Sequence, residues 1–76
     1  MNIEFKHLEK LLNCNTHVKL NLLDKDNILE IKANYKVIST LELSNNNLED
    51  NAKLIYDKLI NLDGITLYIP KVYIKD

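Results

Sequence analysis

The stretch from Val18 to Leu43, VKLNLLDKDNILEIKANYKVISTLEL, decides the fold because apolar and polar residues alternate through most of it. Val18, Leu20 and Leu22 occupy every second position, and polar residues stand between them. A period of two predicts a strand with one buried face and one solvent face. The polar segment DKDN at residues 24–27 then predicts a turn, so the first two strands form a hairpin.

The alternation continues through two further expected strands. In the second strand the buried-face residues are Leu29, Ile31 and Ala33. A short connection near Tyr35 and Lys36 leads to VISTLEL, in which one face carries Val37, Leu41 and Leu43 and the other carries Ile38, Thr40 and Glu42. Two consecutive hairpins predict a meander of three antiparallel strands.

Helical periodicity flanks the meander on both sides. Before it, Asn2 is a candidate cap, and an apolar stripe of Phe5, Leu8, Leu11 and Leu12 predicts an amphipathic helix that ends near residues 13–15. After it, Asn47 and Asp50 resemble a capping box for a second helix. The apolar stripe of that helix is Leu48, Ala52, Ile55, Leu59 and Leu62. Gly64 is placed to end it in left-handed backbone, with Ile65 contacting Ile60.

Beyond Gly64 the period returns to two. Ile65, Leu67 and Ile69 predict a fourth strand, and Pro70 places it at an edge, with a short fifth strand at residues 71–75. The expected order is αβββαβ in one α+β domain spanning residues 1–76. Each helix has one apolar stripe and the sheet has one apolar face, so the prediction is a two-layer fold with an antiparallel sheet and both helices on one side.

Composition excludes several classes of function. The 76 residues carry a formal charge of −1, and all ten basic residues are lysine. Arginine, the residue best suited to bidentate contact with phosphate or guanine, is absent, so direct nucleic-acid binding is not expected. The N-terminus has no signal-peptide pattern, and the longest apolar runs are far short of the roughly 20 residues needed to cross a bilayer. The single cysteine favours a reducing, cytoplasmic setting.

Residues that could carry chemistry do not form a known motif. His7, Cys14 and His17 lack a close-spaced ligand pair and a fourth donor, so exposed histidines and a semi-buried cysteine are expected. Asp24 and Asp26 suit a polar turn better than a calcium loop, which needs more oxygens and a glycine. The only glycine follows a helix, so the chain has no glycine-rich phosphate cradle. We therefore expect no enzyme activity, cofactor or metal.

The sheet face away from the helices is the most informative surface. Apolar residues on it would lie among charged ones such as Lys19 and Lys32, and a contiguous apolar group with a charged rim is typical of a protein interface. The predicted partner-binding residues on this face and in the first hairpin turn are Asp24, Asp26, Glu30, Ile38, Glu42 and Tyr68.

Two families resemble this layout. The order αβββα and the segment NAKLIYDKL resemble the double-stranded RNA-binding domain and its second helix. That family opens the helix with phosphate-gripping lysines, whereas Glu49 and Asp50 stand here, so RNA binding is not expected to transfer.

The layout is also similar to small phage-encoded anti-CRISPR proteins, the αβββα inhibitors of Cas9. They begin with a similar MNI helix and continue into a VKL strand, here residues 1–3 and 18–20. This resemblance implies a cytoplasmic phage or mobile-element inhibitor whose partner is a CRISPR effector nuclease. Many such inhibitors carry a strongly acidic surface, and this chain is nearly neutral.

Three hypotheses therefore stand at this point. The first is a non-enzymatic protein-binding module, in the role of a phage or mobile-element inhibitor. The second is a nucleic-acid binder that uses dispersed lysines, namely Lys19, Lys32, Lys71 and Lys75. The third is a structural subunit that forms a homodimer or larger assembly through the C-terminal strand.

Overall fold

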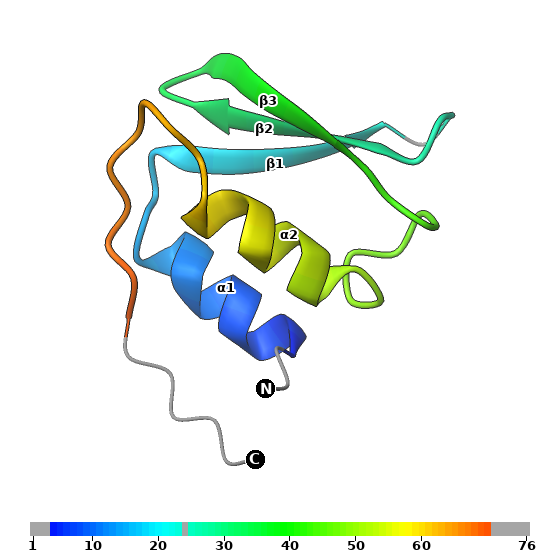
Figure 1. Cartoon of the computed structure of the whole chain (residues 1–76), viewed down its shortest axis with the longest axis horizontal. Coiled ribbons are helices and arrows are strands. Elements are labelled where there is room, and N and C mark those ends of the chain that lie inside the picture. Colours follow the sequence, from blue (N-terminus) through cyan, green and yellow to red (C-terminus); the bar gives the residue numbers. More distant parts are fainter. Residues whose placement is uncertain (1–3, 24, 71–76) are drawn as a thin grey trace.

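The computed structural model describes residues 4–23 and 25–70. Its elements are, in chain order, α1 (Phe5–Asn13), β1 (Val18–Leu23), β2 (Ile28–Ala33), β3 (Lys36–Glu42) and α2 (Ala52–Ile60). The strands form one antiparallel sheet in the order β1-β2-β3, and both helices lie on the same face of it (Figure 1). The expected α+β class and the two-layer packing are confirmed.

The core is a single apolar layer between the sheet and the helices. Across the sheet, Leu20 pairs with Ile31, and Leu29 pairs with both Leu22 and Leu41, so apolar side chains form continuous rows on the inner face. The largest fully buried side chains come from both layers: Leu8, Leu11, Leu29, Ile31, Ile55 and Leu59. Each large apolar side chain removed from water contributes roughly 1.5–3 kcal/mol. This layer is the main source of stability.

Helix α1 presents its apolar stripe to the core as expected. Leu8 and Leu11 are buried, and Phe5 and Leu12 pack against the core from partly buried positions. The expected cap, Asn2, lies outside the described residues. Within them, the backbone N–H of Glu4 donates to Nδ1 of His7 at 2.9 Å, so a side chain from the first turn satisfies a free donor at the helix start.

A β-bulge in β3 changes which residues face outward. Ile31 pairs with Ser39 and the next residue, Lys32, pairs with Val37, so Ile38 has no partner on β2. One extra residue shifts the alternation of a strand. Val37 therefore takes the outer position opposite Lys32 that the alternation had assigned to Ile38, so the prediction that Val37 faces the core is wrong. Ile38 is 39% exposed and lies at the bulge without a cross-strand partner.

Helix α2 begins later than expected, at Ala52 instead of near Leu48. The residues before it form a tight turn, in which the N–H of Asn51 donates to the carbonyl of Leu48 at 3.2 Å. Asn47 still caps this turn, because its Oδ1 accepts the N–H of Asp50 at 3.1 Å. The capping contact was thus predicted correctly, but it closes the turn and not the helix itself.

The buried side chain of Asn51 organises the connection between β3 and α2. It is 4% exposed. Its Oδ1 accepts the backbone N–H of Ser44 at 3.2 Å and the hydroxyl of Ser44 at 3.0 Å. Its Nδ2 donates to the carbonyl of Asn47 at 2.7 Å and to Oδ1 of Asn45 at 3.0 Å. One amide therefore holds both ends of the loop.

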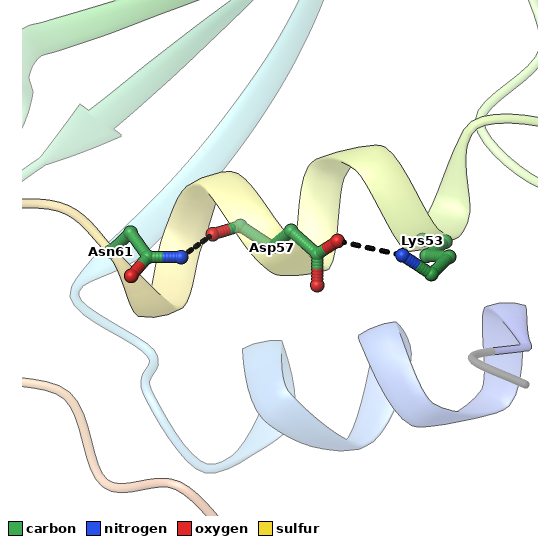
Figure 2. Close-up of polar contacts among 3 residues, drawn as sticks. All are labelled: Lys53, Asp57 and Asn61. Atoms are coloured by element: carbon green, nitrogen blue, oxygen red, sulfur yellow. Dashed lines mark hydrogen bonds and ion pairs between the residues drawn. The ribbon is translucent and has the colours of Figure 1, made fainter. Parts of the chain in front are cut away.

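Exposed polar contacts run along α2 from its first turn to its C-terminal end. Lys53 Nζ donates to Oδ2 of Asp57 at 3.0 Å, and Nδ2 of Asn61 donates to the carbonyl of Asp57 at 2.7 Å (Figure 2). The helix ends at Ile60, earlier than the apolar stripe indicated. Gly64 has the expected left-handed backbone, with φ of 83°, but it lies in the turn beyond the helix end.

The expected fourth strand is not formed. Residues 65–70 follow α2 past the end of the sheet and run beside the connection between α1 and β1, without strand pairing (Figure 1). The predicted assembly edge is therefore missing from this part of the chain. The expected short strand at residues 71–75 lies outside the described residues.

A side chain takes the place of a neighbouring strand for this segment. Asn15 is 3% exposed, and its Oδ1 accepts the N–H of Tyr68 at 2.7 Å while its Nδ2 donates to the carbonyl of Tyr68 at 2.7 Å. The same Nδ2 donates to the carbonyl of Leu11 at 2.7 Å. His17 adds a contact between Nε2 and the carbonyl of Thr66 at 3.0 Å. These bonds tie Thr66 and Tyr68 to the α1–β1 connection without a strand ladder.

Replacing Asn51 with alanine should destabilise the protein by about 2–4 kcal/mol, because it leaves several loop groups without their buried partner. Urea unfolding followed by circular dichroism measures the change. Asn61→Ala is the matched control, since it removes one exposed amide contact on the same helix and should cost less than about 1 kcal/mol. Equal losses in the two variants would contradict the role given to Asn51.

Replacing Asn15 with alanine should release the segment that follows α2. The N–H of Tyr68 loses its only described acceptor, so its hydrogen exchange should accelerate roughly tenfold or more, while the amide of Leu59 in the core should change less. Exchange followed by NMR gives both rates in one experiment. Unchanged protection at Tyr68 would show that other contacts hold this segment.

Candidate functional site

The residues that could carry catalysis or bind a metal lie apart, each in its own setting. His7 accepts a bond at the start of α1, and His17 contacts the carbonyl of Thr66. Cys14 is exposed, so the expectation of a semi-buried cysteine is wrong. Within residues 4–23 and 25–70, no three His, Cys, Asp or Glu residues gather closely enough to hold a metal ion. In the same ranges, no helix is long and apolar enough to cross a bilayer.

The outer face of the sheet is the candidate site. Because both helices cover the inner face, no described helix lies over the outer one (Figure 1). Strand register and alternation place the following residues on it, and we call this set the outer sheet face: Lys19, Asn21, Leu23, Ile28, Glu30, Lys32, Val37, Thr40 and Glu42.

Charge on the outer sheet face is separated along the strands. At one end, Lys19 lies directly opposite Lys32. In the middle row, Glu30 accepts a hydrogen bond from Nδ2 of Asn21 at 2.9 Å. At the other end, Glu42 lies opposite Ile28. The face therefore has a basic end beside the β2–β3 turn and an acidic end beside the β1–β2 turn.

Each charged end of the outer sheet face also carries exposed or half-buried apolar side chains, with Leu23 and Ile28 in the row of Glu42 and Val37 in the row of Lys32. Leu23 is 39% exposed and Val37 is 48% exposed, and Ile28 between their strands is half-buried. Ile38 at the bulge is also 39% exposed. Exposed apolar groups within a polar surround are the usual composition of a protein interface, since they lose water contact when a partner covers them.

The structure gathers some of the predicted partner residues and separates others. Glu30 and Glu42 share the outer sheet face, and Asp26 is exposed in the turn at its acidic end. Tyr68 is 66% exposed, but it belongs to the segment held by Asn15 and not to the sheet, so its predicted place on this face is wrong. Asp24 lies outside the described residues.

The β2–β3 turn adds a residue that the sequence pattern did not single out. Asn34 and Tyr35 both have left-handed backbone, with φ of 52° and 70°. A two-residue hairpin turn of this type favours Asn-Gly, because glycine has no Cβ to clash. Tyrosine at the second position is strained, and its side chain is 100% exposed. The sequence signal for this strained turn was the pair Asn34-Tyr35 between two alternating strands, at the place where Asn-Gly is usual.

A shallow hollow adjoins this turn. Its volume is about 280 Å³, and it is lined by Thr16, His17, Lys19, Asn34 and Tyr35. The N–H of Asn34 donates to the carbonyl of His17 at 3.0 Å, which ties the turn to the start of β1. Tyr35 and Lys19 thus border one concave surface at the basic end of the sheet.

A second hollow lies on the helix side of the sheet. It has a volume of about 340 Å³ and runs between α1 and β1, where its walls include Phe5, Leu8, Leu12, Val18 and Leu20. Most of these side chains already pack in or against the core. This groove is therefore an extension of the core that remains open beside the edge strand.

Comparison of the chain with protein-family models, with curated proteins and with solved structures gave no match.

Proposed function

We propose that the chain is a non-enzymatic protein-binding module that docks through the outer sheet face. The observation that carries the proposal is the uncovered strand face, on which Leu23 remains exposed at the acidic end and Val37 at the basic end. Covering such apolar groups is favourable by roughly 25 cal/mol for each Å² removed from water. The charged ends of the face would then set the orientation of the partner.

The separation of charge favours a protein over a nucleic acid as the partner. A phosphate backbone is negative along its whole length, so Glu30 and Glu42 would repel it from half of the face. A protein surface can carry both signs and complement both ends.

The arrangement of α2 supports the same choice. Glu49 and Asp50 are exposed just before this helix, where the double-stranded RNA-binding domain has lysines. Lys53, the first lysine of the helix, is paired with Asp57 (Figure 2). The helix therefore offers acids and a neutralised lysine where RNA phosphates would have to bind.

Within this proposal, the partner is a host defence nuclease, and the chain acts as an inhibitor from a phage or another mobile element. The support is the αβββα layout together with the MNI and VKL segments, which resemble small anti-CRISPR proteins.

Charge reversal on the outer sheet face tests the docking surface. The double variant Glu30→Lys and Glu42→Lys should lower the recovery of a captured partner roughly tenfold. The new lysines would repel the basic groups of the partner that the two glutamates are proposed to meet. The tagged chain is used for capture from nuclease-treated extract of its host, and each band is quantified by mass spectrometry. Circular dichroism verifies that the variant is folded.

The control is Glu9→Lys with Glu49→Lys, which changes the net charge equally on exposed residues outside the sheet. It should retain the same partner band. Equal recovery with the outer-face variant would exclude this face as the docking surface, and a band that disappears after nuclease treatment would contradict a protein partner.

A cleavage assay tests the inhibitor role separately. The wild-type chain in excess should reduce DNA cleavage by the purified Cas9-type nuclease of its host at least tenfold, and the outer-face variant should restore cleavage. Full cleavage in the presence of the wild-type chain would exclude this nuclease as the target.

A further inference from the structure

The β2–β3 turn has a residue that folding alone does not favour. Tyr35 has a φ of 70°, where most side chains are strained and glycine is preferred. Its side chain is 100% exposed, so no burial in the described fold compensates for that strain. Strained backbone at a fully exposed aromatic residue is an outlier of the kind that concentrates at functional sites.

A second unfavourable feature lies beside the first. Lys19 and Lys32 are directly opposite on neighbouring strands, and like charges at such positions repel. Lys36 follows Tyr35 immediately and is exposed. Among the described residues, no acidic side chain lies within ion-pair distance of any of these lysines. An anionic group from outside would relieve the repulsion.

We propose that Tyr35 and the lysines Lys19, Lys32 and Lys36 form the anchor of the interface, and that they bind an acidic, extended segment of a partner protein. We call these residues the basic tip. This inference rests on the proposed function and adds the chemistry of the partner. Tyrosine is enriched among the residues that dominate binding energy, because it buries a large area with few rotatable bonds.

The hollow beside the basic tip gives the segment a place to bind. Its volume of about 280 Å³ admits one or two side chains, and Lys19 and Tyr35 form part of its wall. A carboxylate entering it approaches the Nζ of Lys19, while the neighbouring part of the segment packs on the ring of Tyr35. Lys32 lies beside Lys19 on the outer sheet face, on the path of the segment, while Lys36 pairs with Ala33 and stands at the turn itself.

An acidic protein segment fits this surface better than a nucleic acid does. Tyr35 is a single aromatic residue on a protruding turn, whereas single-stranded nucleic acids bind along grooves with successive stacking residues. The acidic end of the same face would also repel phosphates. The basic tip is short, so it matches a segment with a few carboxylates and not a long polyanion.

The Tyr35→Gly variant separates binding from folding. Glycine is the preferred residue at this backbone position, so the melting temperature should equal or exceed that of the wild type. The probe is a random peptide library displayed on phage, selected on the wild-type chain. We expect enrichment of Asp and Glu, and the best peptide should bind Tyr35→Gly at least about tenfold more weakly.

Tyr68→Ala is the matched control, because it removes an exposed tyrosine outside the sheet and should bind the same peptide as the wild type. Peptides without acidic enrichment, or equal binding by Tyr35→Gly and the wild type, would overturn the proposal. A labelled 20-nucleotide single strand provides the other arm: stronger binding of this strand than of the best peptide would overturn it in favour of a nucleic acid.

The outcomes also separate this inference from the proposed function. If Tyr35→Gly loses the acidic peptide but charge reversal at Glu30 and Glu42 leaves host capture unchanged, the basic tip stands and docking over the whole face fails. If charge reversal abolishes capture while Tyr35→Gly retains the peptide, the docking surface stands and the anchor fails.

Discussion

The structure depends on one constraint: the chain has enough apolar helix surface to cover one face of its sheet and not both. α1 and α2 each contribute one apolar stripe, and both stripes pack on the inner face (Figure 1). The buried layer formed in this way includes Ile31 from the sheet and Ile55 from α2. The outer face is left to charged and half-exposed residues. Folding and recognition are therefore assigned to opposite faces of the same strands.

Two buried side-chain amides hold the irregular segments on either side of α2, which the apolar layer alone does not fix. Asn51 closes the loop that brings the chain from β3 into α2, and Asn15 holds the segment that leaves α2. A buried polar group is tolerated only when its hydrogen bonds are satisfied. Each of these side chains bonds to backbone in two directions, so each acts as a local substitute for regular secondary structure.

The sequence predicted the architecture well because its signals are local and repeated. The alternation from Val18 to Ala33 and the helical stripe around Leu8 each recur over several residues, and both matched the structure. The failures have non-local causes. The extended segment containing Tyr68 has strand-like alternation, yet a side chain distant in sequence satisfies its backbone. Alternation alone does not distinguish these two situations.

The candidate site was predictable only in part for the same reason. Glu30 and Glu42 share a face because the period of two along each strand determines which side chains point the same way. The bulge at Ile38 could not be predicted in this way, because Val37 and Ile38 are both apolar and β-branched and the pattern does not show which of them faces the core. The backbone of Tyr35 was also hidden, because the usual signal for this turn is Asn-Gly. Sequence pattern therefore misses the positions, such as Ile38 and Tyr35, at which the observed backbone differs from the one that the local sequence favours.

Chemical-shift mapping by NMR tests most directly the claim that the two faces have separate roles. The isotope-labelled chain is titrated with the partner protein captured from its host, and amide shifts are followed residue by residue. The account predicts the largest changes along the outer sheet face and at Tyr35, with small changes on the solvent side of α1 and α2. Changes concentrated on the helices, with the sheet amides unaffected, would contradict it.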